Sequence, residues 1–136
     1  MTGPDADAGA DAGAGAGGAA RPARAYKILT ADQMAHLVRD RVFAGAPIDL
    51  ADGYIHLSTA EQVAGTLDRH FAGQTDLWLA AIDLAPLGDA VRWEPSRGGQ
   101  HFPHLYAPLA WSSVVAHAPV AHDPDGRLRL PDGRAA

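Results

Sequence analysis

The 136-residue chain has no cysteine, a net charge of −5, and no apolar run near the ~20 residues of a membrane span. The lack of cysteine excludes a disulfide framework, a thiol nucleophile and a cysteine-ligated zinc or iron–sulfur site. The acidic balance argues against a nucleic-acid partner, whose phosphates usually meet a basic patch. The N-terminus has neither the basic start nor the leucine-rich stretch of a signal peptide. We therefore expect a cytoplasmic protein with no membrane partner, and its oligomeric state stays open.

The composition changes sharply near residue 25. The first twenty residues are mostly alanine and glycine, with no large apolar side chain beyond the initial methionine. Such a segment cannot bury enough surface to offset the entropy of the chain. We predict a disordered tail and linker over residues 1–24, one globular domain over residues 25–131, and a C-terminal tail over residues 132–136.

Local patterns predict an α+β domain with small mixed or antiparallel sheets and two helices. Thr30 and Gln33 have the spacing of a capping box, so the first helix begins there, and Pro47 ends it. Ser58 or Thr59 caps the second helix. The first helix has a predicted apolar face of Met34, Leu37, Val38 and Val42. Strands are predicted at residues 25–29, 54–58, 77–82, 91–94, 111–117 and 127–130, and a loop rich in glycine and proline at residues 96–108.

The predicted strand at residues 54–58 carries polar side chains on one face. Because strand side chains alternate, Ile55 and Leu57 face the core, while Tyr54, His56 and Ser58 share the other face. Such groups are costly to bury without partners, but they suit a cleft that holds a polar ligand. The helix start after Ser58 also offers N–H groups and a positive dipole end to a phosphate. The alternative is that His56 is a hydrogen-bonded structural residue and Ser58 is only a cap.

A second polar cluster follows the predicted strand at residues 91–94. Glu94 can act as a general base or orient a ribose hydroxyl, and Arg97 can contact a phosphate. The alternative for Glu94 is a surface ion pair with an arginine. His104 and Tyr106 either line the site or pack under the neighbouring prolines.

Two sharper motifs are incomplete. Residues 56–58 read His-Leu-Ser, the form found in two-histidine phosphoesterases, but those enzymes need a second motif to supply both an acid and a base, and none follows. His101 and His104 are three residues apart, yet Pro103 between them argues against a helix that would direct both to one metal. We expect no metal site.

Several segments together resemble the bacterial and plant domain-of-unknown-function family 952, over Tyr26 to about Pro119. Members are sometimes labelled as glutathione S-transferase domain proteins, but this chain is too short for a thioredoxin-like half and a helical half. The segments that carry the resemblance are Asp52-Gly53-Tyr54-Ile55-His56-Leu57-Ser58-Thr59, Gln62, Leu77 to Asp83, Trp93-Glu94, Gly98-Gly99 and Phe102-Pro103-His104-Leu105-Tyr106.

That family is grouped by remote similarity with the ADP-ribosyltransferase fold, which binds NAD in a cleft between two small sheets. The resemblance implies a nucleotide ligand, with ADP-ribosyl transfer or NAD glycohydrolysis as the chemistry. It implies that His56 contacts the nicotinamide ribose, that Tyr54 or Tyr106 stacks on nicotinamide, and that Glu94 stabilises oxocarbenium charge. In this chain Glu94 precedes Tyr106, whereas the transferases have histidine, tyrosine and then glutamate.

The predicted site lies in a cleft lined by His56, Ser58, Glu94 and Tyr106. Its predicted catalytic residues are His56 and Glu94, and no cofactor other than NAD is implied. A non-catalytic nucleotide-binding module and a protein-interaction module are the alternatives. Cleavage of NAD identifies the enzyme, and thermal stabilisation by a nucleotide distinguishes the two modules. The predicted ligand-binding residues are Tyr54, Ser58, Thr59, Arg97, His104 and Tyr106.

Overall fold

The computed structural model describes residues 21–134, so the tail predicted for residues 1–20 lies outside the described residues. The described chain has three small antiparallel sheets, two main helices and a shorter third helix, which confirms the predicted α+β class. The strands are β1 (Arg24–Thr30), β2 (Val42–Phe43), β3 (Ile55–His56), β4 (Leu77–Asp83), β5 (Val91–Pro95), β6 (His101–Leu105), β7 (Leu109–Ala110) and β8 (Val114–Pro119). The helices are α1 (Ala31–Asp40), α2 (Pro47–Asp52) and α3 (Val63–His70), with short 3-10 turns at Ala85–Ala90, Arg97–Gly99 and Trp111–Ser113.

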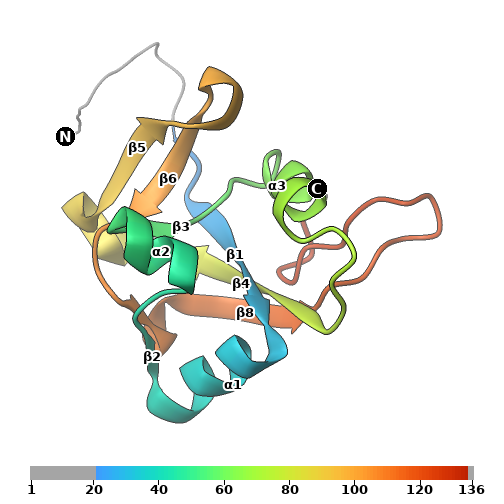
Figure 1. The fold of residues 1–136 in the computed structure, drawn as a ribbon, viewed down its shortest axis with the longest axis horizontal. Coiled ribbons are helices and arrows are strands. Elements are labelled where there is room, and N and C mark those ends of the chain that lie inside the picture. The colour runs from blue at the N-terminus through green and yellow to red at the C-terminus, as the bar shows by residue number, and fades with distance from the viewer. Residues whose placement is uncertain (1–20, 135–136) are drawn as a thin grey trace.

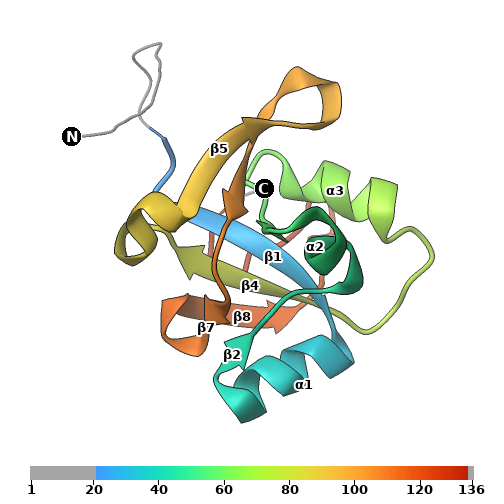
Figure 2. The same ribbon diagram turned by 60° about the vertical axis from the view of Figure 1, so that its left-hand side comes forward.

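The sheet β1-β4-β8 runs through the middle of the fold (Figures 1 and 2). A separate hydrophobic cluster packs against each of its two faces. One face of this sheet packs against α3 and the C-terminal segment, which inserts Leu128 and Leu130. The other face packs against α1 and the two smaller sheets, β2-β7 and β3-β6-β5. The sheet β3-β6-β5 therefore has one face in the core, contributed by residues such as Ile55 and Leu105.

The first helix begins as its sequence predicts. The Gln33 N–H donates to Thr30 Oγ1 at 3.1 Å and the Thr30 N–H donates to Gln33 Oε1 at 3.0 Å, a complete capping box. The helix ends at Asp40, and Val42 lies in β2. Of the predicted apolar face, Met34 and Leu37 are buried, whereas Val38 and Val42 are exposed. That part of the prediction was wrong: Val42 lies beyond the end of the helix, and Val38 lies on the exposed side of its last turn.

The predicted loop at residues 96–108 contains a strand instead. Strand β6 is the central strand of its sheet, between β3 and β5. Pro103 lacks an N–H, but its carbonyl accepts a hydrogen bond from Leu57 N at 3.2 Å. Proline is normally found at sheet edges, so this sequence pattern argues for a loop where the chain forms a strand.

The chain changes sheets at Ser58. Its backbone exchanges two hydrogen bonds with Tyr26 of β1, at 2.7 and 2.9 Å. The backbone N–H groups of Gln62 and Val63 then both donate to the Thr59 carbonyl, at 3.1 and 3.0 Å, and α3 begins only at Val63. The predicted helix start directly after Ser58 was therefore wrong, and these two N–H groups are not free to bind a phosphate.

The two ends of the described chain meet. Asp132 accepts hydrogen bonds from Arg24 Nη1 at 3.0 Å and from the Tyr26 hydroxyl at 2.9 Å. Upstream of Asp132, residues 123–127 form a turn, in which the Asp123 N–H donates to the Arg127 carbonyl at 2.7 Å. Within residues 21–134, no helix has the length and apolar character needed to cross a membrane.

Candidate functional site

The outer face of the β3-β6-β5 sheet gathers most of the predicted site residues. His56 pairs directly with His104 across the β3–β6 ladder, and His104 pairs with Arg92 across the β5–β6 ladder. Residues two positions along a strand share a face. The outer face, called the polar face below, thus consists of Tyr54, His56, Arg92, Glu94, His104 and Tyr106.

Asp49 of α2 anchors His56 from behind. One oxygen, Oδ1, lies 2.6 Å from His56 Nδ1 and accepts the His56 backbone N–H at 3.0 Å. The other, Oδ2, accepts the Ala46 N–H at 2.8 Å and lies 2.9 Å from Lys27 Nζ. The Asp49 side chain is 1% exposed and that of His56 is 31% exposed. Asp49 is therefore saturated with partners, while His56 remains accessible.

The pKa shifts of Asp49 and Lys27 follow from their burial and their contacts. Burial alone would raise the pKa of Asp49, but the His56 hydrogen bond, the Lys27 charge and backbone N–H groups outweigh it and lower the pKa to about 2. Burial lowers the pKa of Lys27, although the neighbouring Asp49 opposes that change. Asp49 and Lys27 thus form a buried ion pair behind the histidine.

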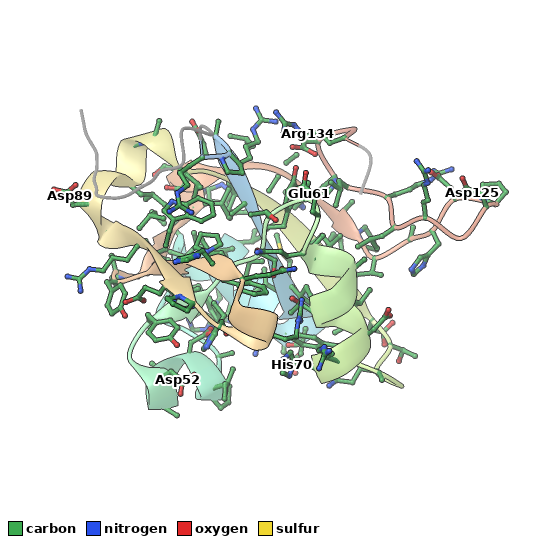
Figure 3. The ribbon with its side chains drawn as sticks, turned by 90° about the horizontal axis from the view of Figure 1, so that it is seen from above. Asp52, Glu61, His70, Asp89, Asp125 and Arg134 are labelled. Atoms are coloured by element: carbon green, nitrogen blue, oxygen red, sulfur yellow. The ribbon has the colours of Figure 1, made fainter. Side chains whose placement is uncertain are left out.

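The second nitrogen of His56 faces another carboxylate. His56 Nε2 lies 2.9 Å from Asp52 Oδ2 at the end of α2, where Figure 3 labels Asp52. A neutral imidazole donates from one nitrogen, and only the imidazolium donates from both. Two flanking carboxylates therefore make His56 a hydrogen-bond donor and disfavour an anion in contact with it.

Glu94 and His104 form a second carboxylate–histidine pair. Glu94 Oε1 lies 2.8 Å from His104 Nδ1 and accepts the Tyr106 hydroxyl at 2.7 Å. Here the carboxylate side chain is 35% exposed and the histidine is 3% exposed. The exposed end of this pair is the acid rather than the imidazole.

The pKa directions of this pair follow from its burial. Burial lowers the pKa of His104 despite the pull of Glu94, so His104 is neutral and its Nδ1 proton bonds the carboxylate. Partial burial would raise the pKa of Glu94, but the Tyr106 and His104 hydrogen bonds lower it. The same hydrogen bond to Glu94, with burial, raises the pKa of Tyr106 to about 12. Glu94 is thus held as a charged carboxylate at neutral pH.

Tyr54 lies at the centre of the polar face. Its ring stacks on His104 at 4.0 Å between centroids, and lies 4.7 Å from His56 and 5.2 Å from Tyr106. The Arg92 guanidinium lies 4.4 Å from the Tyr106 ring centroid. Tyr54 therefore covers His104, which explains why that histidine is buried on an otherwise open face.

A depression of about 300 Å³ adjoins the polar face beside α2. Its surface is about equally polar and apolar, and Asp49 is among its lining residues. The lining includes Leu50, Tyr54, Ile55, Leu105, Tyr106 and Pro108. This volume and chemistry suit a flat ring placed against the two tyrosines.

Three predicted ligand-binding residues lie elsewhere. The Ser58 hydroxyl is buried and lies 3.1 Å from the Thr66 hydroxyl of α3. Arg97 Nη1 donates to the Thr66 hydroxyl at 3.3 Å. The Thr59 backbone N–H donates to Gln62 Oε1 at 3.0 Å. Ser58, Thr59 and Arg97 thus belong to a contact between α3 and the β5–β6 turn. The structure does not bring them to the polar face with His56 and Glu94.

Four residues of this region were not among the site residues predicted from the sequence: Lys27, Asp49, Asp52 and Arg92. A signal for Asp49 was present, because Pro47 at the first position of α2 and Asp49 at the third are typical of a helix start. Among the described residues, no group of three histidine, aspartate or glutamate side chains is placed to hold a metal ion.

The family model described as "Protein of unknown function (DUF952)" matches residues 28–117. The chain belongs to the DUF952 family. This match contains α2 and the whole polar face, and Lys27 lies one residue before it. The resemblance noted from the sequence is thereby confirmed at the level of the family.

Solved structures of another protein are similar to this DUF952 chain. The crystal structure of CC0527 from Caulobacter crescentus is 44% identical, covers 80% of this chain and 96% of its own, and has a TM-score of 0.71. The solution NMR structure of CC0527 is 44% identical, covers 77% and 90%, and has a TM-score of 0.67. A crystal structure of a CC0527 double mutant is 43% identical, covers 80% and 96%, and has a TM-score of 0.71. No curated protein matches the chain.

Proposed function

We propose that the polar face binds a nucleotide, with NAD as the first candidate, and cleaves its N-ribosyl bond. The observation that carries the proposal is the charged, partly exposed carboxylate of Glu94, fixed by Tyr106 and His104. Breaking the bond at the anomeric carbon builds positive charge on the ribose, and a fixed carboxylate stabilises that charge. The remote likeness to the ADP-ribosyltransferase fold, implied by the family resemblance, forms part of this proposal.

The parts of a nucleotide match distinct parts of the polar face. A flat base or nicotinamide ring fits the depression beside Tyr54 and Tyr106. Ribose hydroxyls donate to the Glu94 carboxylate and accept from His56 Nε2. The phosphates contact the exposed Arg92, because Arg97 is engaged with Thr66. This arrangement keeps the phosphates away from the two carboxylates that flank His56.

The direct test is incubation with NAD and quantification of released nicotinamide by chromatography. Glu94→Gln keeps an oxygen to accept the Tyr106 and His104 hydrogen bonds but removes the negative charge. We expect kcat to fall roughly 100-fold or more, the size typical of one lost electrostatic contact in a transition state. The melting temperature should stay near that of the parent. Absence of nicotinamide release by the parent, or full activity of Glu94→Gln, would exclude the proposed chemistry. Stabilisation by NAD without cleavage would support the non-catalytic nucleotide-binding module.

Two arginines provide a matched control for the phosphate contact. Arg92→Gln should raise the KM for NAD about tenfold, because it removes a charge-assisted hydrogen bond. Arg97→Gln removes the same charge from the α3 side and should leave the KM unchanged. The reverse result would place the phosphates beside Thr66 and contradict the proposed orientation.

A further inference from the structure

The two ring nitrogens of His56 have unequal partners. Nδ1 lies 2.6 Å from a buried oxygen of Asp49, whereas Nε2 lies 2.9 Å from Asp52, whose side chain is exposed. A short charge-assisted hydrogen bond in a buried setting holds its proton more tightly than a longer one at the surface. The proton that His56 can give up is therefore the one on Nε2, on the open side of the ring.

The charged and titratable groups around His56 come from several elements. Asp49 and Asp52 approach from α2, Lys27 approaches from β1, and the rings of His104 and Tyr54 pack against the imidazole. Lys27 neutralises Asp49, so Asp52 supplies the remaining negative charge, next to Nε2. Beyond the neutral His104, Glu94 places a second carboxylate on the same face.

We propose that His56 is a general acid acting through Nε2, and that the site therefore also hydrolyses N-ribosides whose base is neutral, such as purine nucleotides. This inference rests on the proposed function, since both reactions need Glu94 to stabilise the ribosyl cation. The nicotinamide of NAD carries a positive charge before cleavage and leaves without a proton. A neutral purine leaves as an anion unless an acid protonates it, and this substrate class is the one that gives a use to the Nε2 proton.

The reaction balances with water as the only co-reactant. The bond between the anomeric carbon and the purine nitrogen breaks, and its electron pair stays on the base. The Nε2 proton passes to another ring nitrogen of the base, which leaves as a neutral purine. Water adds to the anomeric carbon, and the proton it loses restores His56. The products from adenosine monophosphate are adenine and ribose 5-phosphate.

Asp49 and Lys27 are positioning residues in this scheme. Asp49 bonds both the ring and the backbone N–H of His56, so it fixes the ring orientation and keeps a proton on Nδ1. Lys27 keeps Asp49 charged inside the core. Lys27 does not reach the ligand, because it is buried and does not line the depression. Asp49 borders the depression, but both of its carboxylate oxygens are already engaged by protein groups.

The test compares two substrates that differ in their need for an acid. Adenosine monophosphate needs its base protonated, whereas 4-nitrophenyl riboside releases a stable phenolate without a proton. We expect His56→Gln to lower kcat on adenosine monophosphate and to affect 4-nitrophenyl riboside far less, because only the purine needs the Nε2 proton. The loss on adenosine monophosphate should be at least about tenfold larger, since general acid catalysis contributes ~10²–10⁴-fold.

Further variants separate positioning from folding. Lys27→Met/Asp49→Asn removes both buried charges together and leaves the Asn carbonyl to accept the Nδ1 proton. We expect it to fold and to show the same substrate-dependent loss as His56→Gln, to a smaller degree. The control Ser58→Ala, from the α3 contact, should keep the parent ratio of the two rates. The parent ratio in the double variant would overturn the positioning roles.

The outcomes for the inference and for the proposed function are distinguishable. Cleavage of NAD without release of adenine from adenosine monophosphate would overturn the general-acid inference alone. Equal losses on the two substrates in His56→Gln would also overturn it, and would leave His56 as a ribose contact. No cleavage of either NAD or adenosine monophosphate would overturn both.

Discussion

The two carboxylate–histidine pairs of the polar face contain the same groups with opposite exposure. In the Asp49–His56 pair the carboxylate is 1% exposed and the imidazole 31% exposed, whereas in the Glu94–His104 pair the imidazole is 3% exposed and the carboxylate 35% exposed. One pair therefore presents a proton donor to a ligand, and the other presents a negative charge. The identity of the paired groups does not decide their chemistry, because only the exposed member can touch a ligand.

The position of each residue in the fold produces this difference. His104 lies on the central strand β6 and under the Tyr54 ring, while Glu94 lies on β5 at the edge of the sheet. His56 lies on the opposite edge strand, β3, with α2 behind it. A residue on an edge strand has a neighbouring strand on one side only, so its side chain is less covered. The exposed residue of each pair, His56 or Glu94, lies on such an edge strand.

Breaking the buried ion pair should have the largest effect on stability. Asp49→Ala leaves Lys27 charged and unpaired in the core, which costs about 3–5 kcal/mol. Lys27→Met/Asp49→Ala should recover much of that loss, because no buried charge remains. Urea denaturation followed by circular dichroism measures both changes. A single-variant loss below about 1 kcal/mol would mean that the pair is not buried in solution.

Removing each histidine should reveal which one the fold needs. His104→Ala removes a buried ring beneath Tyr54 and should cost roughly 2–3 kcal/mol. His56→Ala removes an accessible ring and leaves Asp49 bonded to Lys27 and two backbone N–H groups, so it should cost about 1 kcal/mol. Thermal melting of the two variants side by side gives the comparison. Equal losses would contradict the inverted exposure of the two pairs.

Lowering the pH should reduce the stability that the buried Asp49 carboxylate contributes through its pairing with Lys27. The folded-state pKa of Asp49 is about 2, below its ordinary value, so its contribution is complete above that ordinary value and is lost as the pH falls through 2. The loss is roughly 2 kcal/mol between pH ~5 and pH ~1. The lowered pKa of His104 also reduces stability in acid. As the pH falls, this histidine is protonated in the unfolded chain before it is protonated in the folded chain. Denaturation across this range should show a shallower acid loss in Lys27→Met/Asp49→Asn than in the parent protein.

The α3 contact provides the smallest expected effect. Ser58→Ala removes one buried hydroxyl bonded to Thr66 and should cost about 1 kcal/mol with no change in NAD cleavage. Parallel melting and nicotinamide-release assays check both statements. A selective loss of cleavage in this variant would return Ser58 to the site that the sequence alone predicted.

The sequence predicted most of the polar face because alternation along a strand depends only on the local chain. Tyr54 and His56 share a face for this reason, and the buried Ile55 and Leu57 occupy the other. Strand alternation did not predict the position of the next polar side chain, Ser58. Ser58 bonds to β1 instead of continuing along β6, so its side chain meets α3. A change of partner strand depends on tertiary contacts that no local pattern contains.

Two further differences have separate physical causes. Pro103 predicts a loop because proline cannot donate in a strand ladder, yet its carbonyl alone supports the pairing with Leu57. Pro47 was interpreted as the end of one helix, although it begins the next, so Asp49 was overlooked. The grouping of Glu94, His104 and Tyr106 was predicted from their proximity in sequence, but their hydrogen bonds depend on the register of β5 and β6.

The bonds from Arg24 and Tyr26 to Asp132 make the described chain nearly circular. When the first strand and the last turn already touch, a short linker between them adds little strain, and the chain can be opened at another exposed turn. The turn at Asp125 and Gly126 is exposed and far from α2 along the surface (Figure 3). A permuted gene that starts there would place Leu128 and Leu130 at the beginning of the chain rather than its end. The order in which the core elements leave the ribosome can thus be changed while the contacts that they make stay the same.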